Sequence, residues 1–396
     1  MKDRRLLWAV GFVALFTLSV LAFLLPCFID GKDISELENR TLTAFPVLNS
    51  DSFLSGSFQD GLEEALGDHI LLSEEVRAVV RDAQTSVLNL EHSAIFTLDP
   101  SLRSGYSQIA DGYYSYGGDP SRIVEKPEDL AGKAEDLRIF ADKLNAIQGI
   151  RTYLYFIQNS RSVDFDHPEE SSVPYDLIRS LFRLDGNAEF TVADYGDYSR
   201  WFYQTDHHWN NRGSYRGYCE IITMMDKGEP IPHGDEVEFP VVFNGSYARQ
   251  TRQLSAEEPF RIYTYEIPKH NVTLNGKRGK YGRLDSYLKG RYEDDSLTNH
   301  YANCYGGEYG EIVYDFGTEG KGTLLMIASS YSNPINALIA SHFDRTVVVD
   351  PRYWEKWTGE SFDPAVCVAR AEADTVLLLG DIRFFTADLT AEGGGD

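Results

Sequence analysis

The C-terminal part of the chain alternates short apolar runs with longer amphipathic stretches. This alternation restricts the possible folds more than any other feature of the sequence. Residues 323–328, 346–349 and 375–379 are apolar runs typical of strands that are covered on both faces. Residues 331–343 and 362–371 lie between them and have the pattern of helices. Strand, helix and strand in close succession imply right-handed parallel crossovers. The pattern predicts an α/β fold with a mainly parallel sheet.

The same alternation is present earlier in the chain. A helix is predicted from Pro127 onward, because proline suits a first helical turn and apolar residues then recur at spacings of three and four. The elements expected after it are a strand at 150–157, a helix at 175–182, a strand at 189–193 and a helix at 209–225. The sheet is therefore expected to draw strands from both ends of one large domain.

Four parts of the chain differ in composition. Residues 1–30 are predicted to form a membrane anchor, and residues 31–120 a separate region with extended stretches and helices at 53–66 and 73–88. Residues 121–390 are predicted to form the main domain. Within it, residues 228–320 break the α/β rhythm with many Gly, Tyr, Asn and Asp residues. We interpret them as an insertion of hairpins and loops, where substrate contacts are expected.

The N-terminus predicts the compartment. Lys2, Arg4 and Arg5 precede an uncharged run from residue 6 to residue 29, which is long enough to cross a hydrocarbon core of about 30 Å. Because basic flanks stay in the cytoplasm, residues after Asp30 are expected outside the cell membrane on a single-pass anchor. A cleaved signal peptide is the alternative, although its apolar stretch is usually shorter.

Charge and cysteine content exclude some classes of function. The formal net charge of −24 disfavours nucleic acid as a partner, because such binding requires lysine and arginine to neutralise phosphates. Beyond Cys27 the chain has Cys219, Cys304 and Cys367, with no C-x-x-C spacing of the kind found in metal sites. Three buried free thiols are expected there, and one disulfide bond with a free thiol is the alternative.

Ser330 and the pair Asp206 and His208 are the candidate catalytic residues. Ser330 follows a predicted buried strand and begins a helix, where backbone N–H groups can meet an oxyanion. In an extended segment, Asp206 and His208 would project to the same side, so that the carboxylate can fix the imidazole tautomer. His207 would then point away.

Two other interpretations of these residues stay open. Ser330 can be a simple helix cap, a role for which Ser329 and Ser332 also compete. The Asp-His-His run can be part of a metal site, for which the segment Asp164-Phe165-Asp166-His167 would supply a third ligand. A metal-dependent phosphoesterase is the function that this second interpretation implies.

Two further segments are candidates for binding substrate. Arg352 and Tyr353 follow a predicted strand, and Arg352 can either hold a substrate oxygen or pair with Asp350 to brace the loop. Near the end of the insertion, a glycine-bearing turn offers amide and aromatic groups to an oxyanion or a sugar. Its residues are Tyr301, Asn303, Tyr305, Gly306 and Gly307. An ordinary tight turn in a tyrosine-rich protein is the alternative.

At these positions the chain resembles the DHHW proteins, which are similar to the alginate O-acetyltransferases of the AlgX and AlgJ type in the SGNH hydrolase-like superfamily. One departure stands out, because Ser329 occupies the position directly before the nucleophile, where the DHHW pattern usually has aspartate. The matching motifs, in chain order, are Glu38-Asn39-Arg40 with Phe45-Pro46, Asp68-His69, Thr205-Asp206-His207-His208-Trp209-Asn210, Phe243-Asn244-Gly245-Ser246-Tyr247, residues 301–307, and Ser329-Ser330-Tyr331-Ser332-Asn333 with Asp350-Pro351-Arg352-Tyr353.

The resemblance implies an SGNH hydrolase-like three-layer fold in which Ser330 is the nucleophile, His208 the base and Asp206 its partner. It implies transfer of an acetyl group to a polysaccharide hydroxyl, or to water in an esterase, without a cofactor or a metal. It also implies a membrane-bound O-acyltransferase as the partner that supplies acetyl groups. A non-catalytic polysaccharide-binding or assembly protein on the same fold is the alternative.

Overall fold

The described residues of the computed structural model fall into two compact units. The described ranges are 34–35, 40–69, 79–80, 83, 127–160, 162–163, 171–251, 258–307 and 309–386. The first unit lies within residues 1–87 and also takes in residues 395–396, and the second lies within residues 88–394. The apolar run at 6–29 and most of the helix predicted at 73–88 lie outside these ranges. No helix in them combines the length and hydropathy needed to cross a membrane.

The first unit includes, among its described residues, two short strands and the helices α2 and α3. Strand β1 (Ile34–Ser35) pairs antiparallel with β2 (Arg40–Thr41), and α2 (Ser50–Ser55) is followed by α3 (Ser57–His69). The single helix expected at 53–66 is therefore wrong. Gly56 adopts a left-handed conformation, with a φ of 87°, and ends α2, as glycine commonly does at a helix C-terminus.

The second unit is built on an eight-stranded sheet with the strand order β4-β3-β12-β10-β11-β9-β7-β8. The strands β4, β3, β12, β10 and β11 are parallel, and the last three pair antiparallel at one edge. The predicted α/β class with a large, mainly parallel sheet is thus confirmed. The strands are β3 (Arg151–Ile157), β4 (Gly186–Phe190), β7 (Asn271–Leu274), β8 (Lys277–Arg278), β9 (Glu311–Asp315), β10 (Thr323–Ala328), β11 (Arg345–Val349) and β12 (Thr375–Asp381).

Residues 228–320 do not stand apart from the sheet, although we expected them to form an insertion. They supply β7, β8 and β9, which extend the sheet beyond β11. They also form a separate antiparallel pair, β5 (Glu236–Phe239) and β6 (Phe260–Tyr263). The described residues of the same segment also form three short helices, namely α9 (Ser246–Thr251), α10 (Leu284–Tyr287) and α11 (His300–Tyr305).

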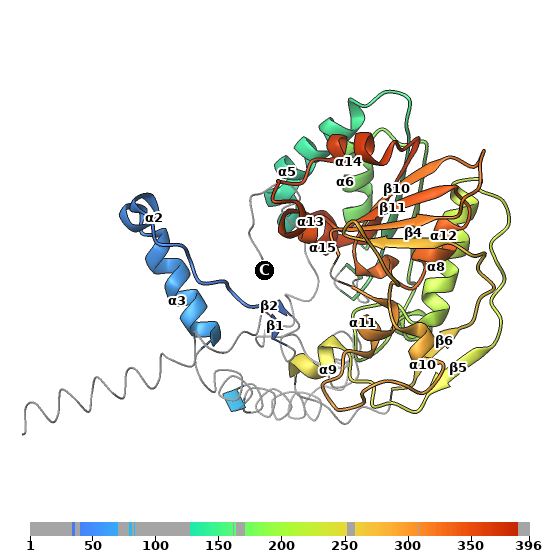
Figure 1. The fold of residues 1–396 in the computed structure, drawn as a ribbon, viewed down its shortest axis with the longest axis horizontal. Helices are drawn as coiled ribbons and strands as arrows, with labels where there is room; N and C mark the ends of the chain where they lie inside the picture. The colour runs from blue at the N-terminus through green and yellow to red at the C-terminus, as the bar shows by residue number, and fades with distance from the viewer. Residues whose placement is uncertain are drawn as a thin grey trace, which may run out of the picture. The chain divides into compact units, whose positions relative to one another are not determined.

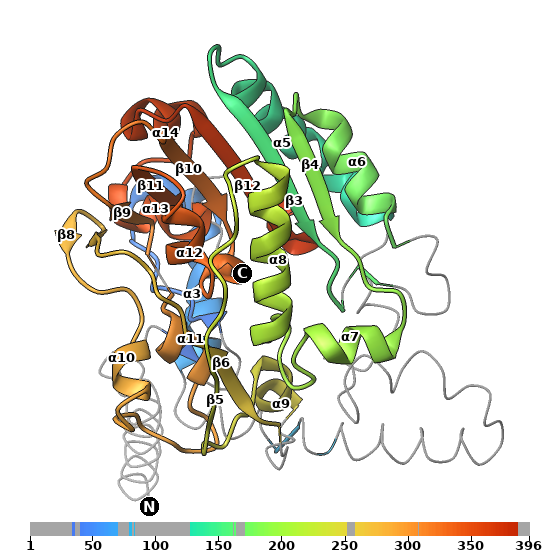
Figure 2. The same ribbon diagram turned by 90° about the vertical axis from the view of Figure 1, so that its right-hand side faces the viewer.

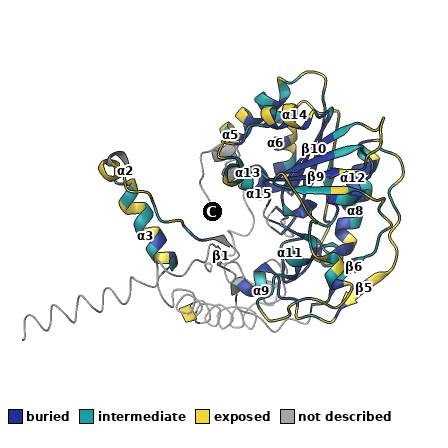
Figure 3. Cartoon of the chain, in the orientation of Figure 1, coloured by how far each residue is buried: buried dark blue, intermediate teal, exposed yellow. Residues whose placement is uncertain are grey.

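The apolar strands are buried because helices cover both faces of the sheet (Figures 1 and 3). Successive side chains of β10 point to opposite faces, so Leu324 and Met326 enter one core while Leu325 and Ile327 enter the other. Helices α8 (Asn211–Met224) and α12 (Asn336–Ala340) supply the first core. The second core is supplied by α5 (Pro127–Asn145), α6 (Val173–Leu181), α13 (Pro351–Thr358), α14 (Pro364–Ala371) and α15 (Ile382–Thr386). Figure 2 shows α8 running along its face of the sheet.

The helix predicted at 331–343 is replaced by two shorter helices. A 3-10 turn, η5 (Ser330–Ser332), follows β10, and α12 begins only at Asn336. Pro334 has no backbone N–H, so it cannot donate the hydrogen bond to the Ser330 carbonyl that a continuous α-helix would require. The chain therefore makes a tight turn directly after the strand, which places Ser330 at its start.

All three cysteines of the second unit are free. Cys304 and Cys367 are buried and Cys219 is half-buried. Burial raises the pKa of the Cys367 thiol to about 12. The expectation of free thiols is confirmed, although Cys219 is less deeply buried than we predicted.

Candidate active site

Polar residues meet where the parallel strands end. Ser330 follows β10, Asp350 follows β11, Asp381 closes β12, and Asn159 lies just beyond β3. Parallel strands bring their carboxyl ends to one edge of the sheet, where ligands bind in open α/β folds. The candidate residues of the nucleophile block therefore lie on the edge that the strand pattern predicted.

Ser330 is the serine of its segment that reaches the histidine loop. It is half-buried, and the N–H of the preceding Ser329 still pairs with the carbonyl of Leu379 at 3.2 Å. The Oγ of Ser332 donates to the Ser329 carbonyl at 3.0 Å, back into its own turn and away from the histidine loop. The N–H groups of Ser330 and Tyr331 donate to no acceptor in the described part of the chain, so the turn presents two backbone donors beside the hydroxyl.

The loop that carries Asp206 and His208 is bent rather than extended, which corrects the expectation from the sequence. It follows α7 (Tyr195–Trp201) and is closed by an antiparallel bridge between Phe202 and Trp209. Within this closed loop, the N–H of Tyr203 donates to the carbonyl of His208 at 3.1 Å. The bridge fixes the two ends of the loop, so its side chains are held at the start of α8.

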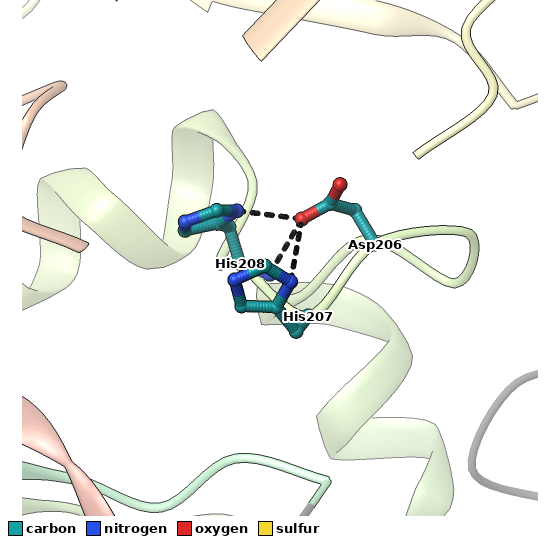
Figure 4. Close-up of side chains that lie close together, drawn as sticks. All are labelled: Asp206, His207 and His208. Carbon is teal, nitrogen blue, oxygen red and sulfur yellow. Dashed lines mark hydrogen bonds and ion pairs between the residues drawn. The ribbon is translucent and has the colours of Figure 1, made fainter. Parts of the chain in front are cut away.

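Asp206, His208 and Ser330 form one hydrogen-bonded row. The Nδ1 of His208 lies 2.6 Å from Oδ1 of Asp206, and its Nε2 lies 2.8 Å from Oγ of Ser330 (Figure 4 shows the Asp206 side). Asp206 and His208 are buried. The ionised carboxylate accepts a hydrogen bond from the Nδ1–H group, so Nε2 is left as an acceptor for the serine hydroxyl.

The carboxylate of Asp206 is fully engaged. Its Oδ1 also accepts the backbone N–H of His208 at 3.0 Å, and its Oδ2 accepts the N–H of Ser246 at 2.6 Å. Burial alone would raise the pKa of Asp206, but the charges of His208 and His207 and these hydrogen bonds outweigh it. The pKa of Asp206 therefore lies well below its usual range, and the group stays ionised.

A glycine allows the Asp206 loop to lie against α9. A Cβ at Gly245 would stand 2.3 Å from the Cβ of Asp206 and 2.4 Å from the carbonyl oxygen of Thr205. Such distances are too short for a Cβ. The N–H of the neighbouring Ser246 therefore reaches Asp206 only because residue 245 is a glycine, which has no side chain. The sequence contained this glycine in a recognised motif, but its purpose became clear from the structure.

His207 does not point away from the site, which corrects a second expectation. Its Nδ1 lies 2.7 Å from Oγ of Ser246 and 3.4 Å from Oδ1 of Asp206, and its ring centroid is 3.9 Å from that of His208 (Figure 4). Because the loop is bent, both imidazoles lie beside the same carboxylate. His207 is therefore part of the electrostatic environment of Asp206.

Asp206, His207 and His208 are also the group of described residues whose ligand atoms are close enough to hold a metal ion, all within 4.8 Å of one another. Nδ1 of His208 and Oδ1 of Asp206 already share a hydrogen bond. An ion placed between them would have to replace that bond. The segment 164–167, considered as a source of another ligand, lies outside the described residues.

Glu258 supports the loop from outside, and no motif in the sequence pointed to it. Its carboxylate accepts the backbone N–H groups of Gln204 at 2.7 Å and Thr205 at 2.8 Å, together with the Thr205 hydroxyl at 2.5 Å. Burial raises the pKa of Glu258, and these three donors oppose that effect. The carboxylate thus satisfies backbone donors directly before Asp206.

A buried polar network lies beneath the site. The Tyr331 hydroxyl donates to the carbonyl of His207 and accepts from Nδ2 of Asn159 at 2.8 Å. The same amide nitrogen donates to Oδ2 of Asp381 at 2.6 Å. The network links the ends of β3 and β12 to the histidine loop. Sequence reasoning missed Asn159 and Asp381, because neither belongs to a motif.

Tyr301 lies inside the site rather than on an exposed sugar-binding surface. Its ring is 2% exposed and stacks on the His208 imidazole, with centroids 3.9 Å apart and planes 14° apart. Its hydroxyl donates to the backbone carbonyl of Ser330 at 3.0 Å. The Tyr305 ring packs edge-on against it at 5.2 Å. The turn proposed for substrate therefore contacts the nucleophile and the base.

The remaining predicted binding residues make contacts of their own. The Gly306 carbonyl accepts from Nδ2 of Asn333 at 2.8 Å, and the Asn303 carbonyl accepts the N–H of Arg283 at 3.1 Å. Gly307 is half-buried, with open space where a Cβ would lie. The bracing role considered for Arg352 is the one observed.

Arg352 donates to both carboxylate oxygens of Asp350, at 3.0 and 2.6 Å, from the first turn of α13. Its guanidinium lies 5.5 Å from the ring centroid of Tyr353, which is half-buried. Contact with substrate stays a prediction for Arg352 and Tyr353, as it does for Asn303, Tyr305 and the two glycines.

Comparisons with known proteins place the chain beside several solved structures. No protein-family model matches the chain, and no curated protein matches it. The chain is similar to a DHHW family protein from Eubacterium siraeum, at 14% identity and a TM-score of 0.49, over 68% of this chain and 88% of the other. It is similar to Bacillus cereus PatB1, at 15% identity and a TM-score of 0.49, over 68% of this chain and 93% of the other.

The O-acetyltransferase domain of Pseudomonas putida AlgJ is also similar, at 12% identity and a TM-score of 0.33, over 67% of this chain and 88% of the other. The solved structures thus include one with the family name that the sequence motifs suggested. At these identities and TM-scores, the similarity assigns no role to any single residue.

Proposed function

We propose that this chain is a serine-dependent O-acetyltransferase or esterase in which Ser330 is the nucleophile, His208 the general base and Asp206 the group that orients the base. The observation that carries the proposal is the row Asp206–His208–Ser330, with a 2.6 Å contact on one side of the imidazole and a 2.8 Å contact on the other. Such a row activates a serine hydroxyl that is otherwise a weak nucleophile.

In the first half-reaction, Oγ of Ser330 attacks the carbonyl carbon of an acetyl ester while His208 takes the hydroxyl proton at Nε2. The N–H groups of Ser330 and Tyr331 stabilise the oxyanion that forms, since no acceptor in the described residues occupies them. The intermediate expels the alcohol, which leaves with the proton from His208. The product is an acetyl ester of Ser330.

In the second half-reaction, a hydroxyl group of the acceptor gives its proton to Nε2 of His208 and attacks the acetyl-serine. Collapse of the intermediate returns the proton to Oγ of Ser330 and releases the acetylated acceptor. Throughout, the ionised Asp206 stabilises the imidazolium that forms in each step. A polysaccharide hydroxyl as acceptor makes the enzyme a transferase, and water makes it an esterase.

The proposal extends to the setting of the reaction. The acceptor is a cell-surface or secreted polysaccharide, and the domain is an SGNH hydrolase-like three-layer fold outside the cell, held by a membrane helix at residues 6–29. A membrane-bound O-acyltransferase supplies the acetyl groups. The uncharged N-terminal run with its basic flank supports the location, and the motif order supports the fold and the chemistry.

A chromogenic acetyl ester tests this function. The full-length chain is expected to release the chromophore, and to transfer the acetyl group to an acceptor oligosaccharide, which mass spectrometry detects. Ser330→Ala should abolish both. Ser332→Ala is the matched control, because it removes a nearby hydroxyl that bonds only the Ser329 carbonyl in the described residues. Equal turnover by Ser330→Ala and the natural chain would refute the proposal.

One observation favours the alternative of a non-catalytic polysaccharide-binding or assembly protein. Ser329 stands where the DHHW pattern usually has aspartate, and its buried Oγ makes no hydrogen bond with any described residue. The site thus lacks a carboxylate next to the nucleophile. Normal binding of polysaccharide without ester cleavage or labelling of Ser330 would support this alternative.

A further inference from the structure

We propose that Tyr301 is a positioning residue that holds the base and the nucleophile together, with its ring against His208 and its hydroxyl on the backbone of Ser330. The inference rests on the proposed function, because it assigns Tyr301 a part in the same proton transfer. Two independent contacts carry it, one made by the ring and one by the hydroxyl.

The ring contact has the geometry of a parallel stack on the imidazole. The centroids are 3.9 Å apart, the planes are 14° apart, and the tyrosine side chain is almost completely buried. When His208 takes the proton of Ser330, it becomes a cation next to the electron-rich face of this ring. Aromatic faces stabilise such cations, and more strongly where water is excluded. The stack therefore favours the state in which the proton has been transferred.

The hydroxyl contact replaces a hydrogen bond that the backbone cannot make. In a continuous helix, the N–H of residue 334 would donate to the carbonyl of Ser330, but residue 334 is proline. The Tyr301 hydroxyl donates to that carbonyl at 3.0 Å, alongside the N–H of Asn333 at 3.2 Å. Burial raises the pKa of the Tyr301 phenol well above its usual value, so the donor keeps its proton.

Tyr301 is itself held in place by α11 and its neighbours. The side chain of Asn299 caps the helix by accepting the N–H of Ala302 at 3.1 Å. The adjacent His300 is buried and bonds the Tyr287 hydroxyl through Nδ1 at 2.8 Å. Helix α11 thus carries a side chain that contacts both the loop at residue 208 and the turn at residue 330.

Among the described residues, few groups face His208, so the effect of Tyr301 is separable. Asp206 and His207 come from the same loop, Ser330 and Tyr331 come from the turn after β10, and Tyr301 comes from α11. Of these, only Asp206 and His207 can carry charge in the working pH range, since burial raises the pKa of both phenols. Replacing the Tyr301 ring leaves those two charges in place.

The test compares Tyr301→Phe and Tyr301→Leu in the full-length chain. It measures kcat and KM for a chromogenic acetyl ester, and the rate at which a serine-reactive phosphonate labels Ser330, across a range of pH. Phenylalanine keeps the ring, so both rates should fall no more than about threefold, with an unchanged pH profile. Leucine should slow both by about tenfold or more, leave KM within about twofold, and move the acidic limb of the profile to lower pH.

Tyr263→Leu is the matched control, because Tyr263 makes the same kind of stack on another imidazole, that of His233, with centroids 4.0 Å and planes 15° apart, and does not stack on His208. It should leave the labelling rate unchanged. If Tyr301→Leu fails to fold, pentafluorophenylalanine at position 301 replaces it, since this residue keeps the ring shape and reverses the charge of its face. The phosphonate should label Ser330 more slowly in this variant than in Tyr301→Phe. Equal labelling rates in the two variants would overturn the inference.

The two proposals fail in different ways. Ser330-dependent ester turnover with a Tyr301→Leu variant as fast as the natural chain overturns the role of Tyr301 alone. Tyr301→Phe as slow as Tyr301→Leu overturns the part assigned to the ring and leaves the hydroxyl as the positioning contact. The labelling rates of the natural chain, Tyr301→Phe and Tyr301→Leu can follow the expected order while no acetyl ester is turned over. That result overturns the proposed function and leaves the positioning role. A natural chain that the phosphonate does not label overturns both.

Discussion

The Nε2 atom of His208 lies 2.8 Å from the Oγ atom of Ser330, although 122 positions separate the two residues in the chain. The contact joins a loop closed by its own backbone bridge to the turn that follows β10. Because β10 is buried within the sheet and paired on both sides, the serine end of this contact is fixed by the core. The contact is the geometric basis of the reaction that we propose.

Replacing Asp206 by asparagine should lower kcat by about 10³- to 10⁴-fold with little change in KM. The amide would present a donor or an uncharged acceptor to Nδ1 of His208, so the tautomer that accepts the Ser330 proton loses its support. Steady-state kinetics with an acetyl ester measures this. Asp285→Asn removes a carboxylate that is exposed and paired with Lys280, and it should leave kcat unchanged. A kcat for Asp206→Asn within tenfold of the natural value would contradict the assignment.

The same carboxylate should stabilise the fold in a pH-dependent way. The pKa of Asp206 is lowered in the folded chain, so below about pH 4 the unfolded chain takes up a proton that the folded chain does not. Its contribution to the free energy of unfolding is therefore complete above that pH and is lost as the pH falls. Urea unfolding of the natural chain and of Asp206→Asn between pH 3 and 7 measures this. The difference between their free energies of unfolding should shrink as the pH falls. A difference that grows toward acid would refute this.

Gly245→Ala should damage both stability and activity. The new Cβ would lie 2.3 Å from the Cβ of Asp206, so the loop or α9 must move. A loss of about 1–3 kcal/mol in the free energy of unfolding is expected, together with at least a tenfold loss in kcat. Gly67→Ala in α3 is the control, since open space surrounds its Cβ and alanine favours a helix. Equal behaviour of the two variants would show that the close approach is unimportant.

Removal of metal ions should leave ester turnover unchanged. Oδ1 of Asp206 and Nδ1 of His208 bond each other, and the proposed mechanism assigns His208 to proton transfer rather than to an ion. Dialysis against a chelator, followed by the ester assay, checks this. A loss of activity that zinc or manganese restores would instead support a metal centre at the Asp206, His207 and His208 group.

The sequence predicted the fold where a local pattern decides it. The strands at residues 323–328 and 375–379 were found because uninterrupted apolar runs need cover on both faces. The prediction of one helix at 331–343 was wrong, because it followed the helical spacing of apolar residues and ignored Pro334, where a continuous helix is interrupted. The antiparallel edge formed by β7, β8 and β9 could not be foreseen, because the pairing of β9 with β11 and of β7 with β9 joins residues that share no local pattern.

The site was predictable in part for the same reason. Asp206 and His208 are two positions apart, and their side chains meet in the bent loop as they would in an extended segment. His207 was misplaced because the bend turns its side chain toward the carboxylate. Tyr301 and Glu258 reach the site through tertiary contacts, and no spacing in the sequence identifies such contacts.

Labelling of the natural chain with a serine-reactive phosphonate, followed by peptide mass spectrometry, tests the central claim most directly. The account predicts one modified residue, Ser330, with labelling at least a hundredfold slower in His208→Ala, because the base is lost. The label should be absent from Ser329 and Ser332. Modification of another serine, or labelling of Ser330 at the same rate without His208, would contradict the account.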